Sequence, residues 1–99
     1  MYAAVREYKF DPKDTAEIDR KVQEILVPQL KKLPGFVDYY WIDTGDGSGA
    51  SMTICKEEAG VKESIRVAAE FVQRELPSKI GKPVVIQGEV KAASQLQRV

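Results

Sequence analysis

Two hydrophobic periodicities alternate along this chain, and their order is the feature that most limits its possible folds. Four segments without helical periodicity, most of them rich in Val, Ile, Tyr or Phe, predict strands at residues 2–10, 36–44, 50–55 and 84–91. Two segments with apolar residues at steps of three and four predict amphipathic helices at residues 18–33 and 58–76. The order predicts an α+β fold, the ferredoxin-like β-α-β-β-α-β plait with a four-stranded antiparallel sheet.

The first predicted helix contains a proline inside its apolar stripe. That stripe consists of Ile18, Val22, Ile25, Leu26, Leu30 and Leu33. Pro28 removes one backbone donor, and its ring clashes with the carbonyl of Glu24, so we expect an irregular helix near this point. The Leu33-Pro34-Gly35 sequence supplies the residues that typically end a helix.

The chain of 99 residues corresponds to one small domain, in which residues 92–99 are predicted to form a tail or arm. Two helices can cover only one face of a four-stranded sheet. Strict alternation in the second strand sends Phe36, Tyr40 and Ile42 to one face, and it sends Val37, Tyr39 and Trp41 to the other. Either set would form a large exposed apolar patch in a monomer.

A second copy of the chain is the simplest cover for the remaining face, because most soluble oligomers are two-fold homodimers. We therefore expect a homodimer formed mainly through the uncovered sheet face, with at least roughly 1,200 Å² of buried surface in total. The polar residues Ser51, Thr53 and Gln87 are expected to lie on that face and either to pair across it or to hold water.

Charge and histidine content exclude several classes of function. Lys and Arg total 15, as do Asp and Glu, so nothing favours non-specific binding to nucleic acid or anionic membranes. No apolar run reaches the length of a membrane span, and the single cysteine fits a reducing compartment, so a cytoplasmic protein is expected. The chain has no histidine, which excludes His-based nucleophile activation, His-ligated zinc and proximal-His haem. No metal and no cofactor are expected.

Several short motifs lie at or near the junctions between the predicted elements. They are Leu33-Pro34-Gly35-Phe36, Tyr39-Tyr40-Trp41, Asp43-Thr44-Gly45-Asp46-Gly47, Ile54-Cys55-Lys56-Glu57-Glu58-Ala59-Gly60 and Gly88-Glu89-Val90. With these motifs, nearly the whole chain resembles the dimeric α+β barrel superfamily, in particular the antibiotic biosynthesis monooxygenase-like domains. The resemblance implies two sheets packed into a barrel, with a pocket in each subunit between its sheet and its helices.

The same resemblance implies two kinds of activity, because members include cofactor-free oxygenases of polycyclic phenols and haem-degrading enzymes. The haem branch needs an axial histidine, which this chain lacks. The active branches often carry His or Asn where this chain reads Glu63-Ser64-Ile65, and Trp where it reads Ile54-Cys55-Lys56.

Aromatic and basic residues are the candidates for ligand binding. Tyr39, Tyr40 and Trp41 could form a wall that stacks on a planar ligand, although packing in the core or the dimer interface is the commoner role. Tyr8 and Arg6 share one side of the first strand, and either of them, or Arg66, could anchor an acidic or phenolic ligand. The alternative for the arginines is an ion pair with an acid such as Glu7, Glu63 or Glu89.

Two further features are assigned structural roles. Gly45, Gly47 and Gly49 favour a hairpin turn, because a phosphate-binding loop would need a helix after it and a strand is predicted there. Cys55 has neither a histidine base nor a second cysteine, so a passive, partly buried thiol is expected.

Three functions remain open from the sequence. The first is a homodimeric monooxygenase-like domain that binds a small, mostly apolar or phenolic molecule, with cofactor-free oxidation of an activated phenol as its reaction. The second is a non-catalytic ligand-binding or assembly module, whose pocket would be small or filled. The third is a cofactor-free isomerase or dehydratase of small lactones, which needs an inward-pointing acid such as Asp38 or Glu89.

Overall fold

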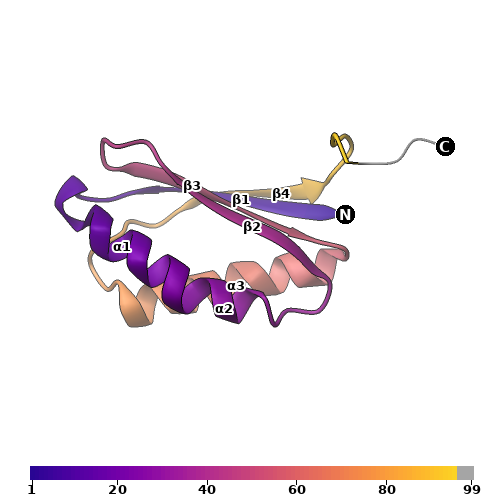
Figure 1. Cartoon of the computed structure of the whole chain (residues 1–99), viewed down its shortest axis with the longest axis horizontal. Helices are drawn as coiled ribbons and strands as arrows, with labels where there is room; N and C mark the ends of the chain where they lie inside the picture. Colours follow the sequence, from indigo (N-terminus) through magenta and orange to yellow (C-terminus); the bar gives the residue numbers. More distant parts are fainter. Residues whose placement is uncertain (96–99) are drawn as a thin grey trace.

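The computed structural model describes residues 1–95 and has one sheet with all its helices on one side (Figure 1). The strands are β1 (Tyr2–Lys9), β2 (Phe36–Asp43), β3 (Ser48–Cys55) and β4 (Val84–Glu89), in the spatial order β2-β3-β1-β4. Every neighbouring pair is antiparallel. This is the predicted ferredoxin-like α+β plait, and the fold class is confirmed.

The first helical stretch is irregular, as Pro28 predicts. It begins after a short turn, η1 (Pro12–Asp14), and runs through α1 (Thr15–Lys21), the π-helical segment η2 (Val22–Leu26) and α2 (Val27–Leu30). At the end of η2 the backbone N–H of Val27 donates to the carbonyl of Val22, five residues back. The wider turn lies directly before Pro28, whose missing N–H would break an ordinary helical ladder. Regular helix ends at Leu30, three residues before the predicted end.

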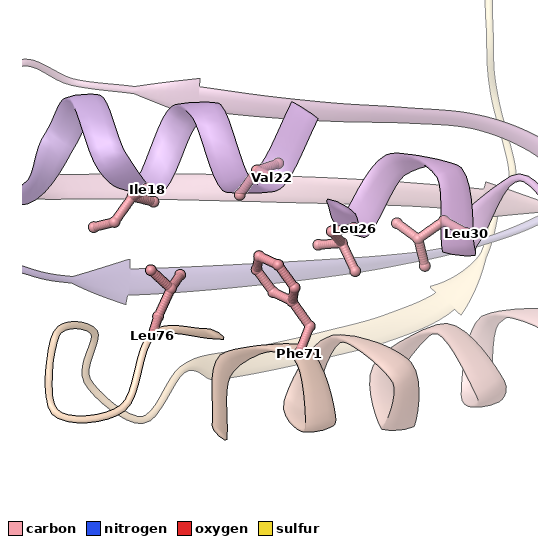
Figure 2. Packing of buried hydrophobic residues seen from close by; sticks show 6 residues of the cluster. All are labelled: Ile18, Val22, Leu26, Leu30, Phe71 and Leu76. Atoms are coloured by element: carbon pink, nitrogen blue, oxygen red, sulfur yellow. The ribbon is translucent and has the colours of Figure 1, made fainter. Parts of the chain in front are cut away.

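The core lies between the two helical stretches on that side of the sheet, as Figure 2 shows. Ile18, Val22, Leu26 and Leu30 point from the first helical stretch towards Phe71 of α3 (Glu58–Glu75) and towards Leu76 just after it. The sheet contributes partly buried residues to the same cluster, namely Phe10, Phe36, Tyr39 and Trp41. Burying each large apolar side chain contributes about 1.5–3 kcal/mol, so this cluster holds the helices on the sheet.

The register between β2 and β3 corrects part of the predicted pattern. Phe36 pairs with Cys55 and Asp38 pairs with Ile54, so a bulge at Val37 shifts the alternation by one residue. Phe36 therefore shares the helix-covered face with Tyr39 and Trp41, and its prediction alongside Tyr40 and Ile42 is wrong.

The predicted placement of three polar residues is also wrong. Ser51 and Thr53 are buried under the helices, and Gln87 shares their face because both it and Thr53 pair with buried Ala4. Alternation fixes only which residues share a face. Their polarity suggested the uncovered side, but helix packing decides which side is covered.

The second face of the sheet has no covering element within residues 1–95, and we call it the open face. Its largest exposed apolar residues are Tyr40, Ile42, Met52, Val84 and Ile86. Ile42 and Ile86 are 60% and 66% exposed, so the patch extends from the β2 edge to the β4 edge. This apolar face is the one from which the homodimer was predicted.

The glycine-rich segment between β2 and β3 is a hairpin turn. The N–H of Gly45 donates to the carboxylate of Asp43, and the N–H of Thr44 donates to the carbonyl of Ser48. Gly47 has a positive φ of 89°, and a Cβ there would lie 2.6 Å from the carbonyl oxygen of Phe10. No helix follows the turn, so the phosphate-loop interpretation does not apply.

Regular structure ends with β4. Residues 90–95 have no helix or strand, and the rest of the predicted tail, residues 96–99, lies outside the described residues. Among residues 1–95, no helix is both long and apolar enough to span a membrane. A cytoplasmic location stays a prediction.

Candidate ligand-binding site

A cavity of about 420 Å³ lies on the helix-covered side of the sheet, between β1, β4 and α3. Its lining comes from four places in the chain: Arg6 and Tyr8 of β1; Ile65, Ala69, Val72 and Gln73 of α3; Ile80–Pro83 of the following loop; and Val85 of β4. The α3 residues recur at helical spacing and form one face of the helix. The volume is within the range of about 300–1,000 Å³ that is typical of small-molecule sites.

Arg6 is the most unusual residue in this lining, because it is only 1% exposed. It occupies the central strand, opposite Ser51 on one side and Val85 on the other. Its Nη2 donates to the Thr53 hydroxyl over 3.4 Å, at the long limit for a hydrogen bond. No hydrogen bond of good geometry engages its buried Nε and Nη1, or the Ser51 hydroxyl, among the described residues, although the Tyr39 side chain lies close to both Arg6 and Ser51.

An arginine in this state is costly for the folded chain. Buried charges are normally paired, and an unpaired buried donor carries its full desolvation penalty of about 1–3 kcal/mol or more when charged. No carboxylate within residues 1–95 forms an ion pair with Arg6. The ion pair that was the alternative role for this arginine is therefore absent from the part of the chain described.

Tyr8 lies beside Arg6 in the same lining and is 6% exposed. Its ring meets the edge of Trp41, with the two ring centroids 6.0 Å apart. Trp41 lies over Gly49, where an added Cβ would come within 2.5 Å of the indole ring. Because Gly49 also pairs with Tyr8, this contact fixes the Trp41 ring beside Tyr8.

Tyr39 and Trp41 contact the core rather than the cavity. They line a separate, more polar groove of about 490 Å³ beside η2, together with Asp19 and Val27. The indole Nε1 donates to the Asp19 carboxylate over 2.8 Å, so this N–H is already engaged. Burial raises the pKa of Tyr39 to about 12, although the positive charge of Arg6 and hydrogen bonding with the nearby Ser51 and Arg6 side chains act in the opposite direction.

Two other predicted ligand-binding residues lie away from the cavity. Tyr40 is 55% exposed on the open face. Arg66 lies on the exposed surface of α3, where it forms ion pairs with Glu63 and Glu70. Glu63 is one of the acids that the alternative interpretation named for the arginines, whereas Glu70 was not named. Of the six residues considered for ligand binding from the sequence, Arg6 and Tyr8 line the cavity and the other four do not.

The carboxylates considered for acid–base chemistry are also outside. Asp38 faces the open side of the sheet because it pairs with Ile54, and Glu89 is exposed and bound to Lys91. No Asp or Glu within residues 1–95 lines the cavity. Cys55 is buried, and burial raises the pKa of its thiol, which makes it a poor nucleophile. No group of three His, Cys, Asp or Glu in the described part of the chain could hold a metal ion.

The sequence contained a usable signal for Arg6. In β1, Ala4, Arg6 and Tyr8 alternate with Glu7 and Lys9, and this alternation predicts that Arg6 and Tyr8 share a side. No comparable signal identified Gln73, Lys82 or Val85, because their meeting depends on how α3 and β4 pack.

Comparison with known proteins identifies the fold. No family model matches the sequence, and no curated protein matches it. A protein of unknown function from Nitrosomonas europaea, NE2512, has a similar structure, with a TM-score of 0.78 and 15% identity over 98% of this chain and 95% of that one.

Two further structures extend this likeness. One is a monooxygenase from the gene ActVA-Orf6 of Streptomyces coelicolor, determined in complex with the ligand nanaomycin D; its TM-score is 0.74, at 16% identity over 97% of this chain and 92% of that chain. The other is a dimeric ferredoxin-like protein from an uncultured marine organism, with a TM-score of 0.68 and 12% identity over 94% and 97% of the two chains. The predicted resemblance to monooxygenase-like α+β proteins is confirmed for the fold.

Proposed function

We propose that this chain binds a small, mostly apolar or phenolic organic molecule in the cavity between β1, β4 and α3. The observation that carries the proposal is Arg6, a buried guanidinium in the cavity lining whose Nε and Nη1 have no partner. Both atoms are enclosed in the unliganded chain, so the Arg6 side chain has to turn towards the cavity before a ligand oxygen can satisfy these donors, which are otherwise buried at a cost. An assembly module, by contrast, would be expected to have a small or filled pocket, and about 420 Å³ is neither.

The reaction that the resemblance implies is cofactor-free oxidation of an activated phenol. A deprotonated phenol can transfer one electron to dioxygen, and recombination of the two radicals forms a carbon–oxygen bond. Loss of water from the resulting peroxide leaves a quinone, so one oxygen atom enters the product and the other leaves as water. Arg6 would stabilise negative charge on the bound ligand, and Tyr8 would orient it from the same strand. No carboxylate lines the cavity among residues 1–95, so lowering the phenol's own pKa is the contribution available to Arg6.

We also propose that the working unit is a homodimer formed through the open face. The support is the apolar surface of Tyr40, Ile42, Met52, Val84 and Ile86, which no element within residues 1–95 covers. The similar protein from the uncultured marine organism is itself dimeric. The cavity lies on the opposite side of the sheet, so dimerisation through this face would leave it accessible.

Ligand binding and oxidation can be tested separately with two phenolic probes. Tm would be measured with and without 2-naphthol and 1-naphthol, and oxygen uptake with 1-naphthol, whose oxidation by this step gives 1,4-naphthoquinone and water, would be compared with its uptake without protein. We expect the probes to raise Tm, and we expect faster oxygen uptake with the protein present.

Arg6→Met tests the assigned site, and Arg20→Met on the exposed surface of α1 is its matched control. Binding and oxygen uptake should fall in Arg6→Met and persist in Arg20→Met. A Tm shift without faster oxygen uptake would support the binding site and contradict the oxygenase activity. A Tm that is unaffected by every organic probe, 2-naphthoate included, would overturn the proposed function.

A further inference from the structure

The charge of the cavity is of one sign only. Arg6 lies buried in its lining, and Lys82 is exposed at its rim. No acidic residue within residues 1–95 lines the cavity, and neither basic side chain has an ion-pair partner there. The remaining lining is mainly apolar, with Ile65, Val72 and Val85 as its larger members. A molecule that complements this surface has an apolar body and a negative charge.

The unpartnered atoms of Arg6 define what kind of negative group fits. Nε carries one N–H and Nη1 carries two, and none of these has an acceptor among the described residues. The flat guanidinium matches a carboxylate particularly well, because two oxygens of one planar group can accept two N–H bonds at once. A phenolate offers a single oxygen and would leave more of these donors without a partner.

Doubly charged groups fit less well than a carboxylate. A phosphate monoester would bring more charge and more oxygens than one buried guanidinium can satisfy, and Lys82 is at the rim rather than beside Arg6 in the buried lining. Each unsatisfied ligand oxygen would then be desolvated without compensation. A single carboxylate carries one negative charge and therefore balances the one buried positive charge of Arg6.

We infer that the cavity selects organic monocarboxylates, with the carboxylate on Arg6 and an aromatic or alicyclic ring system against Ile65, Val72 and Val85. This inference rests on the proposed function, because it specifies the class of molecule that the same cavity takes. In a hydroxylated aromatic acid the carboxylate takes the place of the phenolate at Arg6, so this inference concerns which molecules bind and not the oxidation step. The acid group then fixes orientation and the ring supplies most of the buried surface.

The experiment compares three probes that differ only in the group attached to one ring system: 2-naphthoate, 2-naphthamide and 2-naphthol. Their dissociation constants would be measured at neutral pH by calorimetry on the full chain. We expect 2-naphthoate to bind at least about tenfold more tightly than the amide or the naphthol, a difference equivalent to about 1.4 kcal/mol. The nitrogen resonance of the Arg6 Nε should shift with naphthoate.

Arg6→Met should abolish the preference for naphthoate while retaining weak binding of the neutral probes, and Arg20→Met should leave all three constants unchanged. Loss of an unpaired buried charge should also raise the Tm of Arg6→Met without ligand, which shows that the variant folds. Equal binding of the three probes, or a naphthoate preference that survives in Arg6→Met, would overturn the carboxylate inference and leave the proposed function standing. Failure of all three probes to bind would remove both.

Discussion

Each face of the sheet departs in one respect from the usual distribution of polar and apolar groups. The helix-covered face buries Arg6, Ser51 and Thr53, and the guanidinium has donors without partners. The open face, which no element within residues 1–95 covers, exposes large apolar residues such as Ile42 and Ile86. A single chain in water is therefore unfavourable on both faces, but for different reasons.

The two faces of the sheet would be stabilised by different kinds of contact. A buried charge is relieved by a charged or polar group that reaches it, and only a molecule that enters the cavity can do so. An exposed apolar face is stabilised when its surface is removed from water, and the same face of a second copy offers a surface of matching size. We therefore assign the ligand to the covered face and the partner to the open face, and substitutions on the two faces should behave differently.

The largest effect is expected from Phe71→Ala in the covered core. Phe71 is 1% exposed and contacts residues from the first helical stretch (Figure 2). Truncation should lower the free energy of unfolding by about 3–5 kcal/mol, measured by urea denaturation. A domain of this size is stable by only about 5–15 kcal/mol, so the change is a large fraction of the total.

Ile86→Ala is the matched truncation on the open face. Its effect should disappear at dilutions where the wild type is monomeric, because the exposed side chain then contributes within about 0.5 kcal/mol. The loss in Phe71→Ala should persist at every concentration. A large Ile86→Ala effect in the monomer would mean that the open face is not free in the folded chain.

The second effect concerns assembly. The wild-type chain has a mass of 11.1 kDa, and light scattering at micromolar concentration should give twice that value. Ile42→Glu should reduce the mass to that of the monomer, because the buried carboxylate would replace an apolar contact of about 1.5–3 kcal/mol in each copy. Lys62→Glu on the exposed surface of α3 is the control and should stay dimeric. A wild type that is already monomeric would remove the homodimer proposal.

The predictable and unpredictable parts of the fold differ in physical origin. Strand and helix order followed from periodicity, and the irregular helix followed from Pro28, because both are local properties of the chain. The bulge at Val37 was not predictable, since strict alternation gives no sign of an extra residue. That one residue was enough to place Phe36 on the wrong face.

The site shows the same division. Alternation placed Arg6 and Tyr8 on one side of β1, but it could not show whether an acid from elsewhere in the chain would reach Arg6. Arg66 had acids at positions 63 and 70 of its own helix, and it pairs with both. Partners at helical spacing can be predicted from sequence, whereas the absence of a distant partner needs the packed structure.

A third effect should appear at alkaline pH. Burial raises the pKa of Tyr39 to about 12, above the value of about 10 expected in the unfolded chain. The folded state therefore holds this proton more tightly, and stability should fall as the pH rises from about 10 to 12. The loss is on the order of 2–3 kcal/mol. Tyr39→Phe should weaken this pH dependence. Equal alkaline slopes in the wild type and Tyr39→Phe would contradict the assigned environment of Tyr39.

The smallest effect is expected from Arg66→Met, and it separates the two arginines that the sequence made equal candidates. Arg66 is exposed, and its ion pairs with Glu63 and Glu70 are in contact with water, so screening leaves them little weight in stability. The Tm of Arg66→Met should differ from the wild-type value by less than the Tm of Phe71→Ala or Ile42→Glu does. Its affinity for 2-naphthoate should be unchanged. Arg6→Met should instead raise Tm and lose the naphthoate preference. If Arg66→Met weakened naphthoate binding as much as Arg6→Met, the ligand would have to lie on the outer surface of α3, and the assignment of the cavity would be wrong.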